Sequence, residues 1–319
     1  MKICIVGPGA MSIPPQGWGA VEILIEDYRK TLESLGHRVE IVNTRDPNLI
    51  VGIVNSLQPD FVHIQYDEFV FLSQYFHCKK VAVTSHYGYL EQPNRWDPSY
   101  RNIFWGFVNA NIDVFCLSSG IAEVYKKANI PQEKLHVIPN GVRTDLFHFT
   151  EKCNKPNESV YLAKIDPRKR QSQFQGVSGL KFVGNCVDPK FDVSSPDYLG
   201  EWKKSQIYEG LTDFANLVLL SDGEAHPLVC LEALSAGLGI VISEYASANL
   251  DTSLPFISVI PEKDIDDKRL VESAIIENRN ASVKMREQIR DYAKNFDWSH
   301  IVSDVYVPKV LQIMSRHGE

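Results

Sequence analysis

Several features that would mark a specialised class of protein are missing from this sequence. The 319 residues carry a net charge of −7, so the basic field typical of a nucleic-acid-binding protein is absent. No apolar run approaches the roughly 18 residues that a membrane-spanning helix needs. The first residues contain one lysine and a short apolar stretch, which we interpret as a strand rather than a secretory signal. These absences favour a cytoplasmic globular protein without nucleic-acid partners.

Metal-binding and disulfide patterns are also missing. The six cysteines are dispersed along the chain and form no C-x-x-C pair. His63, His77 and His136 have no spacing typical of metal ligands. We therefore expect free cysteines in a reducing compartment, no metal site and no bound cofactor.

Apolar periodicity predicts an α/β arrangement in the first half of the chain. Short apolar runs alternate with segments in which apolar residues recur at helical spacing. The expected strands are residues 2–6, 38–42, 61–64, 81–84, 114–117 and 135–138, and the expected helices are residues 20–35, 49–57, 99–109 and 121–128. Alternation of this kind implies β-α-β units and a parallel, doubly wound sheet.

A second α/β half follows a polar stretch at residues 148–159, which we interpret as a linker. Its expected elements are strands at 160–164, 180–183, 217–220 and 239–243, and helices at 228–236, 268–295 and 301–314. The sequence thus predicts an N-terminal domain at 1–150 and a C-terminal domain at 151–298. We expect a last helix within 299–319 to pack back on the N-terminal domain.

Two glycines precede the first predicted helix. Gly17 and Gly19 would let backbone N–H groups approach an anion, and the helix dipole adds about half a positive charge there. The alternative is a glycine-capped loop without a ligand. Residues 7–12 resemble part of a dinucleotide fingerprint, but Ser12 replaces its third glycine and prolines follow. Nicotinamide binding is therefore disfavoured.

A cluster of basic residues follows the strand expected at 160–164. Lys164, Arg168, Lys169 and Arg170 lie within seven residues of an otherwise acidic chain. They could hold a diphosphate at the carboxyl end of a strand, where α/β folds bind ligands. A solvated basic turn is the alternative.

Two carboxylates flank the start of the helix expected at 228–236. Glu232 lies eight positions after Glu224, which would place the two up to ~12 Å apart on a helix. That exceeds the spacing of about 5–9.5 Å in a glycosidase pair. The two carboxylates could instead contact opposite ends of one ligand, with the amides of Leu228 and Val229 facing a phosphate. Alternatively, Glu224 only favours the positive end of the helix.

The spacing of Glu224 and Glu232, followed by Ala-Leu-Ser-Ala-Gly, resembles the E-x7-E signature of GT-B glycosyltransferases of the retaining family GT4. Five further segments resemble the family's motifs in its order: residues 14–22, 84–86, 137–142, 162–169 and 296–298. The likeness covers nearly the whole chain. It implies two Rossmann-like doubly wound domains facing a cleft. It also implies metal-independent transfer of a sugar, with retention, from a nucleoside diphosphate sugar to an acceptor.

The resemblance assigns roles to individual residues. The residues expected to act in catalysis are Glu224, Lys169, Lys164 and His86, with the lysines on the diphosphate, Glu224 on the donor sugar and His86 near the anomeric carbon or acceptor. The residues expected to bind the donor also include Gly17, Gly19, Gly200, Leu228, Val229 and Glu232. Among these, Glu232 would bind the ribose hydroxyls, and Gly200 with Leu199 would form a strand that meets the nucleobase.

The sequence departs from the family at several of these positions. Ala20, Ala163 and Arg170 stand where the family has glycine, and Lys164 stands where it has arginine. Lysine keeps the charge but lacks the bidentate guanidinium fork. Two alternatives therefore stay open: a GT-B nucleotide-sugar epimerase or phosphorylase, and a non-catalytic nucleotide-sugar binder.

The expected partners are a nucleotide sugar and an acceptor. The nucleoside diphosphate of the donor is UDP, GDP or ADP, and the acceptor is a sugar, a glycan or a small molecule. We expect membrane contact only if the acceptor is a lipid. The aromatic stretch at residues 87–105 is the candidate acceptor surface.

Overall fold

The computed structural model describes residues 1–17 and 19–316, which form two compact units. Unit 1 comprises residues 1–141 and the chain from Trp298 onward, and unit 2 comprises residues 142–297. Unit 1 thus ends at Gly141, before the expected boundary at 150, because Val142 and Phe147 are buried in the hydrophobic core of unit 2. Trp18 and the last three residues of the predicted segment 299–319 lie outside the described residues.

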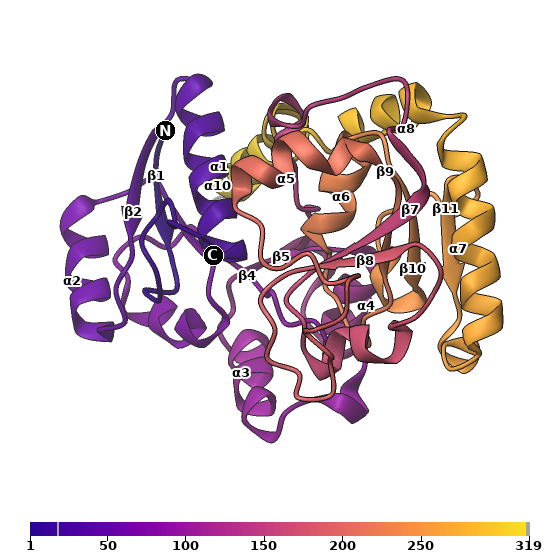
Figure 1. The fold of residues 1–319 in the computed structure, drawn as a ribbon. Coiled ribbons are helices and arrows are strands. Elements are labelled where there is room, and N and C mark those ends of the chain that lie inside the picture. The colour runs from indigo at the N-terminus through magenta and orange to yellow at the C-terminus, as the bar shows by residue number, and fades with distance from the viewer. Residues whose placement is uncertain (18, 317–319) are drawn as a thin grey trace. The chain divides into compact units, whose positions relative to one another are not determined.

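Unit 1 contains a six-stranded parallel sheet (Figure 1). Its strands are β1 (Lys2–Val6), β2 (Arg38–Val42), β3 (Phe61–Ile64), β4 (Val81–Thr84), β5 (Asp113–Cys116) and β6 (Leu135–Val137), in the order β2-β1-β3-β4-β5-β6. Its helices include α1 (Ala20–Ser34), α2 (Pro47–Leu57), η1 (Asp67–Tyr75), α3 (Pro98–Asn109) and α4 (Ser119–Lys127). Because all strands are parallel, their carboxyl ends share one edge, and β3 and β4 are neighbours there.

The first helix shows how local sequence sets an element boundary. Gly36 follows α1 with a φ of 83°, and the N–H of His37 bonds the carbonyl of Leu32 at 3.0 Å. Glycine adopts this left-handed conformation without a Cβ clash, so the helix ends where the sequence predicts.

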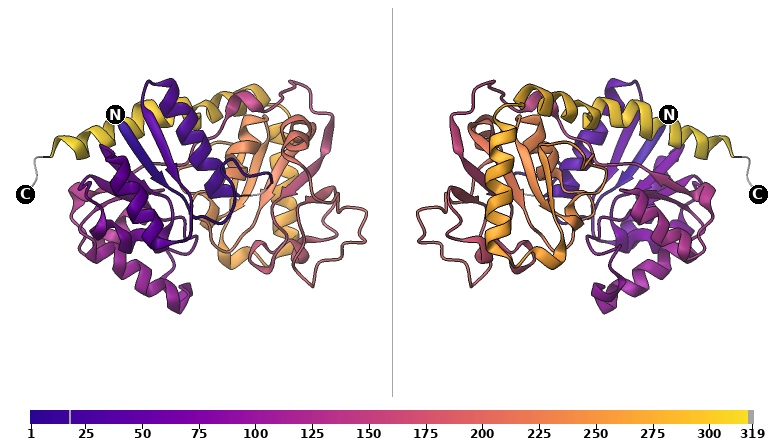
Figure 2. Two further views of the ribbon diagram at one scale, coloured as in Figure 1. Left: turned by 90° about the vertical axis from the view of Figure 1, so that its left-hand side faces the viewer. Right: turned by 90° about the vertical axis from the view of Figure 1, so that its right-hand side faces the viewer.

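The C-terminal segment packs on the sheet of unit 1. It comprises α9 (Trp298–His300), a π-helical turn η11 (Ile301–Tyr306) and α10 (Val307–Ser315) (Figure 2). Tyr306 is fully buried, and its ring contacts those of Tyr28, His63 and Phe115. These aromatic contacts anchor the end of the chain to the same core as β3 and β5.

Unit 2 contains a five-stranded parallel sheet. Its strands are β7 (Lys155–Leu162), β8 (Leu180–Val183), β9 (Phe214–Leu219), β10 (Gly239–Ser243) and β11 (Ile257–Ile260), in the order β11-β10-β9-β7-β8. Its main helices are α5 (Lys204–Gly210), α6 (Leu228–Ser235), α7 (Lys268–Ser282) and α8 (Arg286–Ala293). Helix α7 packs across β7, β9, β10 and β11 (Figure 2).

In unit 2, the expected linker and the expected long helix are wrong. The linker expected at 148–159 is partly strand, because β7 begins at Lys155, which pairs with Phe214 of β9. The single helix expected at 268–295 is broken into α7 and α8. At the break, Arg286 turns inward and donates to the carbonyls of Thr212 at 2.6 Å and Thr150 at 2.8 Å. A buried guanidinium needs such acceptors, so the chain bends to supply them.

Two of the motifs that resemble the family lie where the chain passes between the units. In unit 1, a Cβ on Gly141 would come within 2.5 Å of the Trp298 ring. In unit 2, the N–H of Val142 bonds the carbonyl of Phe296 at 2.8 Å, and the hydroxyl of Thr144 bonds the Asp297 carboxylate. These contacts give residues 137–142 and 296–298 a packing role.

Within the described ranges, no helix combines the length and apolarity needed to cross a membrane.

Candidate functional site

The candidate donor site lies on unit 2, at the carboxyl ends of β7 and β9. These strands are neighbours in the sheet, so the loops that follow them leave the same edge. The loop after β7 carries Lys164 and Lys169, and the loop after β9 carries Glu224 and leads into α6. Parallel sheets bind ligands at this edge, since helix N-termini and loops converge there.

Lys169 and Glu224 are in direct contact, although they are 55 residues apart in the sequence. The Lys169 ammonium forms an ion pair with Glu224 Oε1, and both side chains are about one-tenth exposed. Ser221 Oγ donates to the same carboxylate oxygen at 2.6 Å. Two of the four residues expected to act in catalysis are therefore brought together.

Tyr161 fixes the backbone around this ion pair. Its side chain is buried in β7, and its hydroxyl donates to the carbonyl of Lys169 while accepting the N–H of Leu220 at 2.7 Å. Burial raises the pKa of Tyr161, so its hydroxyl stays protonated and able to donate. The phenol thus bonds both loops, which are also joined by the N–H of Asp222 donating to the carbonyl of Arg168 at 3.0 Å.

Helix α6 begins beside the pair. Its first residue follows Pro227, and no side chain caps its first turn. The amides of Leu228 and Val229 have no acceptor within the helix, which is the usual geometry for receiving an anion. Further along α6, Glu232 Oε1 lies 3.6 Å from the ammonium of Lys204 on α5. The sequence alone does not indicate Lys204 as a site residue, because its ion pair with Glu232 depends on how α5 and α6 pack.

The other basic residues of the cluster differ in their surroundings. Lys164 is exposed and forms no ion pair with any described residue. Arg168, one of the four basic residues of the cluster, donates to the carbonyl of Gly223 and lies 3.9 Å from Glu224, so it joins the site. Arg170 is buried and forms a bidentate pair with Glu262, which directs its charge away from a ligand.

Arg170 also shows how the chain accommodates a departure from the family. Its φ of 60° lies in the left-handed region, where the family's glycine would be unstrained. The bidentate contact with Glu262 holds the arginine in that conformation.

The segment expected to meet a nucleobase is not a strand. Tyr198 forms an isolated bridge with Phe182, and Leu199 donates to the carbonyl of Phe182 at 2.9 Å. Gly200 has a φ of 77°, and a Cβ there would meet nothing within 4 Å. The carbonyl of Gly200 accepts the N–H of Gly184, the residue after β8, at 3.0 Å, and the space beside Gly200 is open.

The carboxyl edge of unit 1 holds a chain of polar side chains that ends at His86. Nε2 of His86 donates a hydrogen bond to the side-chain amide oxygen Oε1 of Gln65, at 2.8 Å. The Gln65 amide nitrogen is 3.4 Å from Nδ1 of His63, and His63 Nε2 is 2.8 Å from Thr84 Oγ1. Because an amide oxygen can only accept a hydrogen bond, Nε2 of His86 carries the proton, and Nδ1 of the neutral ring is an acceptor.

Burial lowers the pKa of both His63 and His86. His63 is fully buried, which lowers its pKa to about 3, with a smaller contribution from nearby His86. Burial also lowers the pKa of His86, against an opposing effect of the Asp67 carboxylate. Both imidazoles are therefore neutral at pH 7.

Asp67 organises the loop that carries His86. Its carboxylate accepts from Ser85 Oγ at 2.5 Å, from Tyr100 Oη at 2.8 Å and from the His86 amide at 3.1 Å. Sequence reasoning missed Asp67 and Gln65, although each follows the apolar run of β3 at the edge where ligands bind.

The glycine loop before α1 lies in unit 1. Gly19 occupies the N-cap of α1 without a side-chain cap, and a Cβ at Gly17 would meet nothing within 4 Å. Glu22 lies in the first turn of α1, where its carboxylate complements the positive end of the helix. A Cβ at Gly19 would be 3.0 Å from that carboxylate.

Among the residues described, no group of three His, Cys, Asp or Glu side chains is arranged to hold a metal ion.

Comparisons with known proteins agree with this architecture. Residues 48–146, which lie in unit 1 except for the last five, match the family Glycosyltransferase Family 4. No curated protein matches the chain. Among solved structures, HepE from Anabaena in complex with UDP and glucose is 14% identical, with a TM-score of 0.71 over 98% of this chain and 99% of that one.

Two further structures share the fold. Sucrose-phosphate synthase from Thermosynechococcus elongatus is 13% identical, with a TM-score of 0.73 over 94% of this chain and 96% of that one. The lipopolysaccharide outer core galactosyltransferase WaaB is 16% identical, with a TM-score of 0.68 over 98% and 99%. The chain has the GT-B fold, with two Rossmann-like units that each contain a parallel sheet.

Proposed function

We propose that this GT4-like chain is a glycosyltransferase that moves a sugar from a nucleoside diphosphate sugar to an acceptor, with retention of anomeric configuration. The observation that carries the proposal is the convergence of Lys169, Glu224 and the N-terminus of α6 at the carboxyl edge of the unit 2 sheet. UDP-glucose is the first donor to test, because HepE, a structure of the same fold, has been solved with UDP-glucose bound.

The donor diphosphate would be bound by Lys169 and by the amides of Leu228 and Val229. Breaking the bond between the anomeric carbon and the phosphate oxygen leaves negative charge on the diphosphate, which fixed positive groups stabilise. At an effective dielectric near 20, one charge pair at ~4 Å is worth about 4 kcal/mol. Lys164 is exposed, so its side chain can reach a phosphate without breaking an ion pair.

The two ion pairs of the site would exchange partners when donor binds. Lys169 is paired with Glu224, and Lys204 lies 3.6 Å from Glu232. A diphosphate competes with Glu224 for Lys169, which frees this carboxylate to accept from hydroxyls of the donor sugar. In the same way, Glu232 would accept from the ribose hydroxyls. Both carboxylates are mostly buried, so each needs a replacement partner, and the substrate supplies it.

The acceptor oxygen forms a new bond to the anomeric carbon as the diphosphate leaves. In the front-face route that the resemblance implies, the proton of the acceptor hydroxyl passes to the departing phosphate oxygen. His86 is proposed to orient the acceptor, since Gln65 fixes its tautomer and leaves Nδ1 as a hydrogen-bond acceptor.

Turnover of UDP-glucose tests the proposal. The protein is incubated with UDP-glucose and a panel of glucosides, galactosides and glycolipids, and UDP release is measured. The expected products are UDP and an α-glucoside, whose anomeric proton identifies retention by NMR. Lys190→Ala is the control variant, because this lysine is exposed and forms no ion pair with any described residue. A β-linked product would contradict retention. An isomerised free sugar formed without acceptor would favour an epimerase, and binding without turnover would favour a non-catalytic role.

A further inference from the structure

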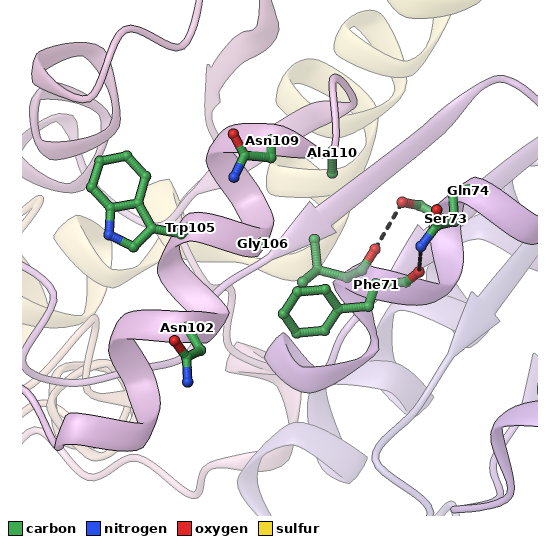
Figure 3. Close-up of a pocket in the computed structure, with 9 residues that line it drawn as sticks. Phe71, Ser73, Gln74, Asn102, Trp105, Gly106, Asn109 and Ala110 are labelled. Carbon is green, nitrogen blue, oxygen red and sulfur yellow. Dashed lines mark hydrogen bonds between the residues drawn. The ribbon is translucent and has the colours of Figure 1, made fainter.

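A second candidate site lies on unit 1, in a hollow between η1 and α3. The hollow has a volume of about 470 Å³, within the range of small-molecule sites. Figure 3 shows Trp105 and Phe71 on either side of Gly106, with Asn102 and Asn109 further along α3 in either direction. None of the residues assigned to the donor site or to the edge at His86 lines this hollow.

One face of α3 carries three exposed residues, Asn102, Trp105 and Asn109, and the buried Gly106. Asn102, Trp105, Gly106 and Asn109 are spaced i, i+3, i+4 and i+7, so they share one face of the helix. The opposite face, which includes Phe104 and Phe107, is buried. Mid-helix glycine costs about 1 kcal/mol relative to alanine, so Gly106 reflects the close packing of η1 on this face rather than a preference of the helix.

Gly106 lines the hollow at the point where α3 and η1 pack closely together. A Cβ at this position would lie 2.6 Å from the Phe71 ring and 3.0 Å from Val70. Glycine therefore lets η1 approach α3 closely and sets the Phe71 ring beside the helix. Phe71 is 45% exposed and Trp105 is 54% exposed, so two aromatic surfaces border one depression and both face solvent.

The polar side chains of the hollow carry no charge. Asn102 and Asn109 are exposed and make no hydrogen bond with any described residue, so both amides can bind a ligand. Gln74 also lines the hollow, and its amide nitrogen donates to the Phe71 carbonyl at 3.0 Å. Each amide offers a donor and an acceptor side by side, which matches a pair of neighbouring hydroxyls. No Lys, Arg, Asp or Glu lines the hollow, which disfavours a nucleotide or another anion.

We propose that this hollow binds a neutral saccharide. The C–H face of a pyranose carries partial positive charge and stacks on the negative face of an aromatic ring, here Trp105 or Phe71. The hydroxyls at the edge of the sugar bond the amides of Asn102 and Asn109. The proposal concerns binding alone and does not depend on the proposed transfer reaction.

The test measures the binding of cellotetraose and of maltotetraose to the full chain, by saturation-transfer NMR and by calorimetry. We expect binding of at least one of the two sugars at millimolar concentration. Trp105→Ala should weaken it about tenfold, from loss of the stacked ring, while Trp105→Phe should retain part of it. The double variant Asn102→Ala, Asn109→Ala should also weaken binding.

Tyr75→Ala is the matched control. Tyr75 is another exposed aromatic residue of η1 but does not line the hollow, so its loss should leave saccharide binding unchanged. The thermal shift given by UDP should be the same in Trp105→Ala as in the unaltered protein, which separates this site from the donor site. Absence of binding to both sugars would overturn the proposal, as would binding that Trp105→Ala leaves intact. Dimerisation or vesicle association that Trp105→Ala abolishes, without sugar binding, would assign the hollow to another occupant.

Discussion

The imidazole of His86 is fixed by Gln65, whose amide oxygen accepts from His86 Nε2 at 2.8 Å. Gln65 follows β3 and His86 follows β4, so the neighbouring positions of these two strands create the contact. The amide determines which nitrogen of His86 carries the proton. It thereby sets the side of the ring that can accept from a substrate.

Gln65→Glu should raise the pKa of His86. In the unaltered protein, burial holds this pKa below 6.5. A carboxylate at 2.8 Å favours the imidazolium, and an opposite charge this close shifts a pKa by about one unit or more. NMR titration of the histidine ring protons measures the shift. Gln132→Glu, at an exposed position of unit 1, is the control. An unchanged His86 pKa in Gln65→Glu would contradict the contact.

Stability should fall as the pH drops from 7 toward 4. Burial lowers the pKa of His63 to about 3 and that of His226 to about 4, whereas both titrate near 6.5 when unfolded. Below pH 6.5 the unfolded chain binds protons that the folded chain does not, so the free energy of unfolding decreases. The contribution of one such histidine is about 1.4 kcal/mol per pH unit.

Urea denaturation at pH 7 and pH 5 measures this dependence. His63→Gln should lower stability at pH 7 and flatten the dependence on pH. His148→Gln, whose side chain is exposed, should leave the slope unchanged. If His63→Gln and the unaltered protein lost the same free energy between the two pH values, His63 would not be the titrating group.

Lys169→Ala should weaken UDP binding by about tenfold to a hundredfold. A hydrogen bond to a charged group contributes about 1.5–3 kcal/mol, and Glu224 would be left without its cation. Calorimetry with UDP measures the affinity, and thermal unfolding without ligand shows whether the variant is folded. The control is Lys190→Ala. Equal UDP affinity in a folded Lys169→Ala variant would remove Lys169 from the donor site.

Gly141→Ala should destabilise unit 1 by about 1–3 kcal/mol, the usual cost of overpacking. Its Cβ would lie 2.5 Å from the ring of Trp298, which is fully buried. Gly52→Ala is the contrasting variant, because this glycine lies within α2 and a Cβ there meets nothing within 4 Å. It should stabilise the protein by up to about 1 kcal/mol. Denaturation curves in which both variants matched the unaltered protein would contradict the packing role.

The strands could be predicted where an apolar run is bounded by polar residues or glycine, as at β3, β4, β8 and β10. Other elements could not be predicted, among them one helix and one strand of unit 2. Helix α5 has one buried residue, Ile207, so it shows no helical periodicity. Strand β11 is four residues long and is half-exposed at Ser258 and Val259. Both are positioned by tertiary packing rather than by local pattern.

The candidate site was predictable in its residue types but not in its pairings. Spacing and resemblance indicated Lys169, Glu224 and Glu232. The contact between Lys169 and Glu224 depends on β7 and β9 being neighbours, and that between Glu232 and Lys204 depends on the packing of α5 and α6. Sheet order and helix packing are non-local properties, so single-residue patterns do not reveal such partners.

The most direct test of the account is thermal unfolding of the full chain with saturating UDP, GDP or ADP, with NAD for comparison. A ligand at 100 times its dissociation constant adds about 2.7 kcal/mol to the free energy of unfolding. For units of this size the transition should rise by about 2–4 °C per kcal/mol. The account predicts such a shift with one nucleoside diphosphate, UDP being the first choice, and none with NAD. A shift with NAD alone, or with none of the three nucleoside diphosphates, would contradict a nucleotide-sugar site at Lys169 and Glu224.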